Sequence, residues 1–89
     1  MKLIYCPKCS DIVRLLDFKR ICHCGESYGY YMQDNINAKI GGKAIPIGFL
    51  NWAFVNAIKQ QPEEGEGKRF EAVVIPRKCP SITVFKEED

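Results

Sequence analysis

Four cysteines near the amino terminus restrict what this chain can fold into more than any other feature. They form two close pairs, Cys6-Pro7-Lys8-Cys9 and Cys22-His23-Cys24, separated by twelve residues. Thiolates paired at short spacing, with a second pair following, are typical of a tetrahedral metal site with four sulfur ligands. Because the two pairs must meet in space to share one ion, the sequence predicts a metal-closed lobe at the start of the chain.

The length of the chain makes such a metal important for stability. With 89 residues, the chain buries a limited core, and small domains often need a metal to supply folding free energy. We expect a single domain over residues 1–89, with a metal lobe at 1–33 and a sheet-and-helix part at 34–89. The predicted ion is a structural Zn²⁺. Iron is an alternative, because four sulfur ligands suit it as well.

The hydrophobic pattern predicts an α+β fold. Alternating apolar residues indicate short strands at 2–5, 10–16, 27–33 and 36–40, and a stripe at helical spacing predicts a helix at about 49–60. We expect an N-terminal hairpin that continues into an antiparallel meander, one helix packed on the sheet, and two short C-terminal strands. The apolar run at 70–75 predicts an interior strand. Pro46 suits only an edge strand or a strand end.

The cysteine pairs and the hairpin between them resemble the zinc ribbons, a family of rubredoxin-like, metal-bound β-hairpins, over about residues 3–32. The resemblance implies one structural zinc held by Cys6, Cys9, Cys22 and Cys24. The second pair departs from the family pattern, because only His23 separates its two sulfurs where zinc ribbons usually have two residues. His23 or Cys79 therefore stays open as a substitute ligand.

The remaining sequence argues against several classes of function. No stretch is long and apolar enough to cross a bilayer. We expect a cytoplasmic protein, because thiols stay reduced there and close cysteine pairs then bind metal and do not form disulfides. An enzyme is the weakest hypothesis. His23 is the only histidine, and a four-cysteine zinc has no open coordination position. Gly65-Glu66-Gly67-Lys68 lacks the full phosphate-loop pattern.

Basic and aromatic residues suggest a binding function. The formal charge of +2 is cancelled once four thiolates and one Zn²⁺ are counted, so only local clusters argue for nucleic acid. We predict a non-enzymatic regulatory or adaptor module that binds nucleic acid or a protein partner, because aromatic residues on a strand can stack bases. Its candidate contacts are Lys8, Arg14, Lys19, Arg20, Tyr28, Tyr30, Tyr31 and Trp52.

Two further hypotheses involve the predicted helix. One is a small-molecule pocket between helix and sheet, near Tyr31, Trp52 and the Gly41-Gly42 turn, with the zinc purely structural. The other is a homodimer through the helix at 49–60. Phe49, Trp52 and Val55 form a second apolar strip on this helix, which is more apolar surface than a small monomer usually exposes.

Overall fold

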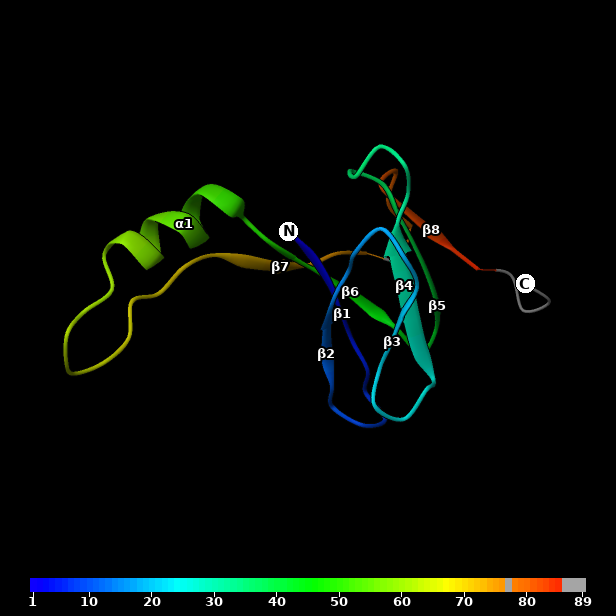
Figure 1. Ribbon diagram of the computed structural model, residues 1–89, viewed down its shortest axis with the longest axis horizontal. Coiled ribbons are helices and arrows are strands. Elements are labelled where there is room, and N and C mark those ends of the chain that lie inside the picture. Colours follow the sequence, from blue (N-terminus) through cyan, green and yellow to red (C-terminus); the bar gives the residue numbers. More distant parts are fainter. Residues whose placement is uncertain (77, 86–89) are drawn as a thin grey trace.

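The computed structural model describes residues 1–76 and 78–85, which form eight strands in two sheets and one helix (Figure 1). The predicted α+β class is confirmed, and the sheets do not close into a barrel. In chain order the elements are β1 (Lys2–Tyr5), β2 (Ile12–Arg14), β3 (Arg20–Ile21), β4 (Ser27–Tyr31), β5 (Ala38–Gly42), β6 (Ile45–Phe49), α1 (Asn51–Lys59), β7 (Ala72–Val74) and β8 (Ile82–Val84).

The first sheet has the strand order β2-β1-β6-β7, and all its neighbours are antiparallel. Ile4 lies at its centre, opposite Val13 on one side and Pro46 on the other. Pro46 is thus inside a strand with neighbours on both sides. Its carbonyl accepts the N–H of Ile75 at 2.9 Å. Because Ile75 lies just beyond the end of β7, the N–H that proline lacks would not have bonded to a residue of β7, and the ladder between β6 and β7 stays complete.

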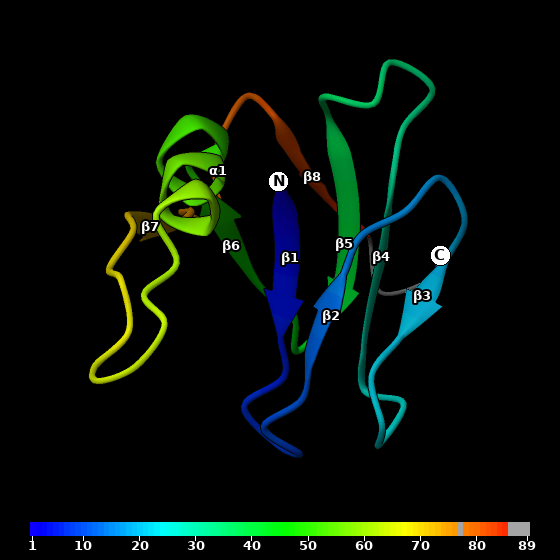
Figure 2. The same cartoon turned by 60° about the vertical axis from the view of Figure 1, so that its left-hand side comes forward.

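The second sheet has the order β3-β4-β5-β8. Its first three strands are antiparallel, whereas β8 runs parallel to β5, with Ala38 opposite Ile82 and Ile40 opposite Val84. A parallel neighbour requires a long crossover. Here the crossover contains β6, α1 and β7, so the chain passes through the first sheet before its last strand completes the second (Figure 2).

One buried cluster joins the two sheets. The first sheet and the segment after β2 contribute Ile4, Val13 and Leu15, and the second sheet contributes Ile40 and other apolar residues. A Cβ at Gly29 would lie 3.3 Å from Leu15 and 3.1 Å from Ile40, so β4 approaches this core closely. Burial of these side chains is the main force that holds the sheets face to face. The complete cluster is Ile4, Cys6, Val13, Leu15, Cys22, Ala38, Ile40, Ala44 and Ile82.

The helix, the loop after it and β7, which is the edge strand of the first sheet, form an arm that extends to one side of the other strands (Figures 1 and 2). We define the arm as residues 50–75. Three aromatic rings, those of Phe49, Phe54 and Phe70, hold it together with centroids 5.0–5.5 Å apart. Ala57 is the only buried helix residue. The helix ends at Lys59, shortly before Pro62, which cannot continue it. Residues 1–76 and 78–85 contain no helix with the length and apolar character that a membrane span requires.

Candidate functional site

Two tight turns present the four cysteines, one from each sheet. In the turn between β1 and β2, the Cys6 N–H donates to the Asp11 carbonyl at 2.9 Å, and the Ser10 N–H donates to the Cys6 carbonyl at 2.7 Å. The turn between β3 and β4 is closed by the Gly25 N–H, which donates to the Cys22 carbonyl at 3.1 Å. In both turns the residue directly after the second cysteine has a left-handed backbone, with φ 62° at Ser10 and 86° at Gly25.

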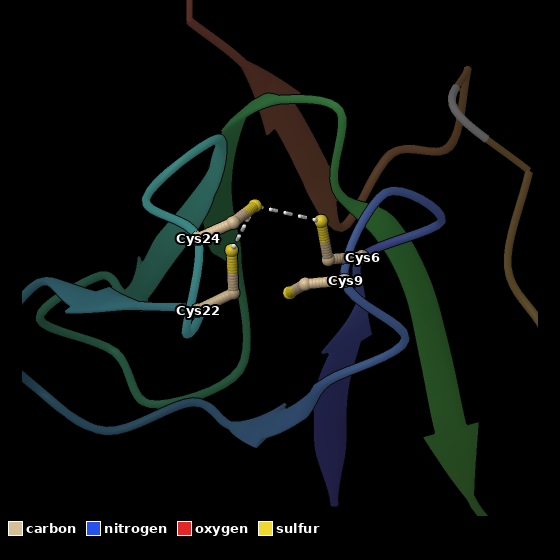
Figure 3. Close-up of side chains that lie close together, drawn as sticks. All are labelled: Cys6, Cys9, Cys22 and Cys24. Carbon is tan, nitrogen blue, oxygen red and sulfur yellow. Dashed lines mark hydrogen bonds between the residues drawn. The ribbon is translucent and has the colours of Figure 1, made fainter.

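The turns bring the four sulfurs together (Figure 3). The Cys24 Sγ lies 3.7 Å from the Cys6 Sγ and 3.6 Å from the Cys22 Sγ, and all four ligand atoms lie within 4.8 Å of one another. Cys6 and Cys22 are buried and belong to the core cluster. The site is therefore continuous with the core and lies where the two sheets meet.

Hydrogen-bond donors surround the sulfurs. The hydroxyl of Ser27, followed by the backbone N–H groups of Cys9 and Lys8, lowers the pKa of the Cys6 thiol to about 6 against the opposing effect of burial. The Ser27 N–H also donates to the Cys22 Sγ at 3.3 Å. Ser27 is completely buried. A buried hydroxyl beside sulfur fits a site built to hold thiolates.

Four sulfurs in this space cannot all be anions without a cation. The backbone N–H of Glu26 acts to lower the pKa of the Cys24 thiol, but burial and the neighbouring Cys22, Cys9 and Cys6 raise it to about 12. A metal ion removes this conflict, because it replaces the protons and compensates the negative charge. The four cysteines thus form a site that can bind a metal ion.

Polar contacts outside the sulfurs connect the two turns. Lys8 forms an ion pair with Glu26, and the Lys43 Nζ lies 3.8 Å from the same carboxylate. Lys8 lowers the pKa of Glu26 through a hydrogen bond. The Asp11 carboxylate accepts the His23 N–H at 2.9 Å. These contacts align the turns, but exposed pairs of this kind contribute little to stability.

Neither alternative ligand joins the four sulfurs. His23 is exposed, and the group of residues that could hold a metal, taken over the described part of the chain, contains only the four paired cysteines. The Cys79 Sγ instead lies 3.4 Å from the Ser81 Oγ, in a short bridge that pairs Cys79 with Ile82.

A second cluster lies on the outer face of the second sheet. Tyr28 and Tyr30 project from β4 to the side opposite the core, and Phe85 follows β8. The Phe85 ring centroid is 5.4 Å from that of Tyr28 and 6.0 Å from that of Tyr30. We call these three rings the aromatic platform. Gly41 makes room for it, because a Cβ there would lie 2.2 Å from the Tyr28 ring.

Two lysines cover the aromatic platform. The Lys19 Nζ lies 4.4 Å from the Tyr28 ring centroid, and the Lys39 Nζ lies 4.3 Å from that of Phe85. Lys39 is opposite Tyr30 in the β4–β5 ladder and opposite Thr83 in the β5–β8 ladder. The platform therefore combines positive charge with half-buried aromatic rings, and the Phe85 ring is tilted by 59° to that of Tyr28 and by 60° to that of Tyr30.

The other predicted contact residues lie apart from the platform. The Tyr31 hydroxyl accepts the Lys2 N–H at 2.7 Å, so this ring turns towards the first sheet. The Arg20 guanidinium donates to the Arg14 carbonyl at 3.1 Å. Lys8 lies beside the sulfurs, and Trp52, which is 66% exposed, lies on the arm. Sequence reasoning missed Phe85 and Lys39, since their proximity to the tyrosines depends on the parallel pairing of β8.

The expected pocket near Tyr31, Trp52 and Gly41-Gly42 does not form as a unit. An open cavity of about 750 Å³ between the helix and the sheets is lined by Tyr31, Phe54 and Val55 among others, but by neither Trp52 nor the two glycines. A second cavity, of about 440 Å³, lies between the helix and the loop after it. Gly41 is instead covered by Tyr28 on the outer face.

Comparison with known proteins adds no further assignment. No family model, curated protein or solved structure matches this chain. The function must therefore be argued from the metal site and the platform themselves.

Proposed function

We propose that this protein is a zinc-stabilised module that binds single-stranded nucleic acid on the aromatic platform of its second sheet. The observation that carries the proposal is the grouping of three aromatic rings and two lysines on one outer sheet face. In this role the protein acts as a regulatory or adaptor module and has no catalytic site.

The distances between sulfurs fit a tetrahedral ion of the size of zinc, and iron bound to four sulfurs fits them equally. A Zn²⁺ ion bound to four thiolates at about 2.3 Å requires neighbouring sulfurs about 3.8 Å apart. Two of the separations between sulfurs, 3.7 Å and 3.6 Å, are close to this value, and all four sulfurs lie within 4.8 Å of one another. With four protein ligands, the zinc would have a structural role, holding together one turn from each sheet. Such a thiolate site persists in a reducing compartment, which supports a cytoplasmic location.

The chemistry of the platform supports nucleic acid as the ligand. Bases stack on exposed aromatic rings with about 1–3 kcal/mol per base, and nearby lysines contact the phosphates. Lys19 and Lys39 lie over rings that a base would occupy. Binding would move each ammonium group from a ring face, where it gains about 0.5–1 kcal/mol at an exposed site, to a phosphate. Single strands fit better than duplexes, because duplex bases are already stacked on each other.

The metal is tested by removing one ligand. We expect purified protein to contain one zinc ion per chain, measured by mass spectrometry of the metals. Cys22→Ser should lose this zinc and unfold the two cysteine turns, as seen by amide NMR. Cys79→Ser is the matched control, because Cys79 lies outside the group of four, and it should retain the metal. Stoichiometric zinc in Cys22→Ser would refute the site.

Nucleic-acid binding is tested by fluorescence anisotropy with labelled single-stranded oligonucleotides at low salt. Tyr30→Ala and Phe85→Ala should each weaken binding about 5- to 150-fold, the range that corresponds to one stacked base. Lys39→Ala should also reduce the slope of log K against log salt by about 0.7.

Matched controls on the arm separate the platform from unspecific effects. Trp52→Ala removes another exposed aromatic ring, and Lys59→Ala removes an exposed lysine. Both should bind like the parent protein. The proposal is wrong if single strands do not bind at low salt, or if the arm variants weaken binding and the platform variants do not.

A further inference from the structure

The larger of the two cavities beside the helix combines apolar walls with positive charge. Its volume is about 750 Å³, and it opens where the start of β1, the end of β2 and the start of α1 come together. Cavities of about 300–1,000 Å³ with mainly apolar walls are the usual sites for small organic ligands. The apolar lining residues include Leu15, Leu16, Ile36, Phe54 and Val55. Because Leu15 is 1% exposed and belongs to the core cluster, the cavity reaches the core.

Contacts within the protein hold Lys2 in the wall of this cavity. Its backbone N–H donates to the Tyr31 hydroxyl at 2.7 Å, and its Nζ donates to the Ile36 carbonyl at 2.6 Å. The same Nζ lies 5.9 Å from the Tyr31 ring centroid. An ammonium group has three N–H donors, of which this carbonyl uses one, and the Tyr31 hydroxyl still has its own hydrogen to donate. Both residues can therefore donate to a ligand from positions that are fixed in advance.

A second positive residue, Arg14, lines the same cavity. Lys2 and Arg14 both lower the pKa of the Met1 amine, after the larger effect of its burial, so their charges act on the same region. Both ion pairs among the described residues involve Glu26, so neither of these two cations is neutralised in one of them. Asp17 is the acidic residue of the described lining. Two positive side chains and one negative side chain give the lining a net charge of +1.

We propose that this cavity binds a small organic carboxylate with an aromatic or branched apolar body. The carboxylate would accept hydrogen bonds from Lys2, Arg14 and the Tyr31 hydroxyl, and hydrogen bonds between charged groups are the strong ones. The apolar body would lie against Leu15 and Phe54, which line the cavity. A single negative charge balances the net charge of the lining side chains, whereas a phosphate monoester, with about two negative charges at neutral pH, exceeds it.

This cavity is separate from the aromatic platform. Tyr31 turns towards the first sheet, whereas Tyr28 and Tyr30 project from the side of β4 opposite the core. The described lining of the cavity includes neither Lys19 nor Lys39. Carboxylate binding is therefore a second activity, independent of the proposed nucleic-acid binding, and the failure of one would leave the other standing.

The test titrates the metal-loaded protein with naphthalene-2-carboxylate and follows the backbone amides by NMR. We expect saturable binding with a Kd of about 0.1–1 mM, which is usual for a ligand with about a dozen non-hydrogen atoms. The amides of Leu15, Leu16 and Val55 should shift. Naphthalene-2-methanol keeps the apolar body and lacks the charge, so it should bind about 5-fold or more weakly than the carboxylate. Naphthalene-2-methylammonium, with the opposite charge, should bind more weakly still.

Substitutions that remove one charge identify the residues that hold the carboxylate. Lys2→Gln and Arg14→Gln should each weaken binding about 3- to 15-fold, between the effects of exposed and of buried charged hydrogen bonds. Both variants keep the backbone bond between Lys2 and Tyr31, and their amide spectra show whether the fold is retained. Lys59→Gln is the matched control, because Lys59 is an exposed lysine on the arm outside this cavity, and it should bind like the parent.

Four results would overturn the proposal. The first is the absence of saturable binding at millimolar carboxylate. The second is equal binding of the carboxylate and the alcohol, which would leave the positive charge without a role. The third is a set of shifts around Gly65 and Phe70, because these residues line the other cavity beside the helix. The fourth is that neither Lys2→Gln nor Arg14→Gln weakens binding more than the control does.

Discussion

The contact between Gly41 and Tyr28 allows a sharp test of how the aromatic platform is built. In Gly41→Ala, the new methyl group would lie 2.2 Å from the Tyr28 ring. The ring must therefore retreat by about 1.3–1.8 Å to reach van der Waals distance. Gly41 is not among the residues with positive φ, so the substitution introduces a steric conflict without backbone strain.

The size of the effect follows from the contacts of Tyr28. Its displacement weakens the ring contact with Phe85 at 5.4 Å, which contributes about 0.5–1.5 kcal/mol. It also weakens the contact with Lys19 at 4.4 Å, which contributes about 0.5–1 kcal/mol. Alanine recovers about 0.5–1 kcal/mol over glycine in a strand. We expect a net loss of about 0.5–1.5 kcal/mol in the free energy of unfolding.

A double-mutant cycle separates the two effects. A Tyr28→Ala background lacks the three atoms nearest to the new methyl group, so Gly41→Ala should stabilise the protein there by about 0.5–1 kcal/mol. The sign of the substitution therefore reverses between backgrounds, with a coupling energy of about 1–2.5 kcal/mol. Urea denaturation of the metal-loaded proteins measures all four corners of the cycle. Equal effects of Gly41→Ala in both backgrounds would refute the packing of Tyr28 over Gly41.

Three further predictions concern the core, the first cysteine turn and the metal. Ile4→Ala removes a side chain with 0% exposure between the sheets and should lower the free energy of unfolding by about 2–5 kcal/mol; a loss below about 1 kcal/mol in urea titration would contradict the described core. At Ser10, with φ 62°, valine should destabilise by about 1–3 kcal/mol and glycine should not, and thermal unfolding that ranks them in reverse would refute the turn geometry. Lowering the pH from about 7 to 5 should release zinc to a colorimetric chelator, because protons compete for the thiolates that bind it; pH-independent retention would argue against thiolate ligands.

The cysteine site was the part that local sequence predicted best. Ligand spacing reports which turns must meet, and the structure places Cys6, Cys9, Cys22 and Cys24 together. The alternation of Tyr28 and Tyr30 with Ser27, Gly29 and Tyr31 also separated the two faces of β4. It did not determine which face is covered, because that depends on the packing of the other sheet against the buried side.

Long-range pairing accounts for what the sequence did not predict. The apolar run at 70–75 was expected inside a sheet, but an apolar strand at an edge has the same composition, and Val73 and Val74 prove to be exposed. Phe85 joins the tyrosines only because β8 lies parallel to β5, after a crossover of almost forty residues. No local sequence signal marks such a connection, because β8 and its partner β5 lie far apart in the sequence. The entropic cost of closing the long loop between them does not depend on any nearby residue.

The position of β8 far behind the cysteines in the chain has a consequence for protein synthesis. Both cysteine pairs lie within the first 24 residues, so a growing chain has all four sulfurs long before the second sheet is complete. Phe85 comes more than fifty residues later than Tyr30. A prematurely terminated product would contain the whole metal site and lack the third ring of the platform. Metal content alone would then fail to distinguish such fragments from chains that include β8, whereas a ligand that requires Phe85 would bind only chains that include this residue.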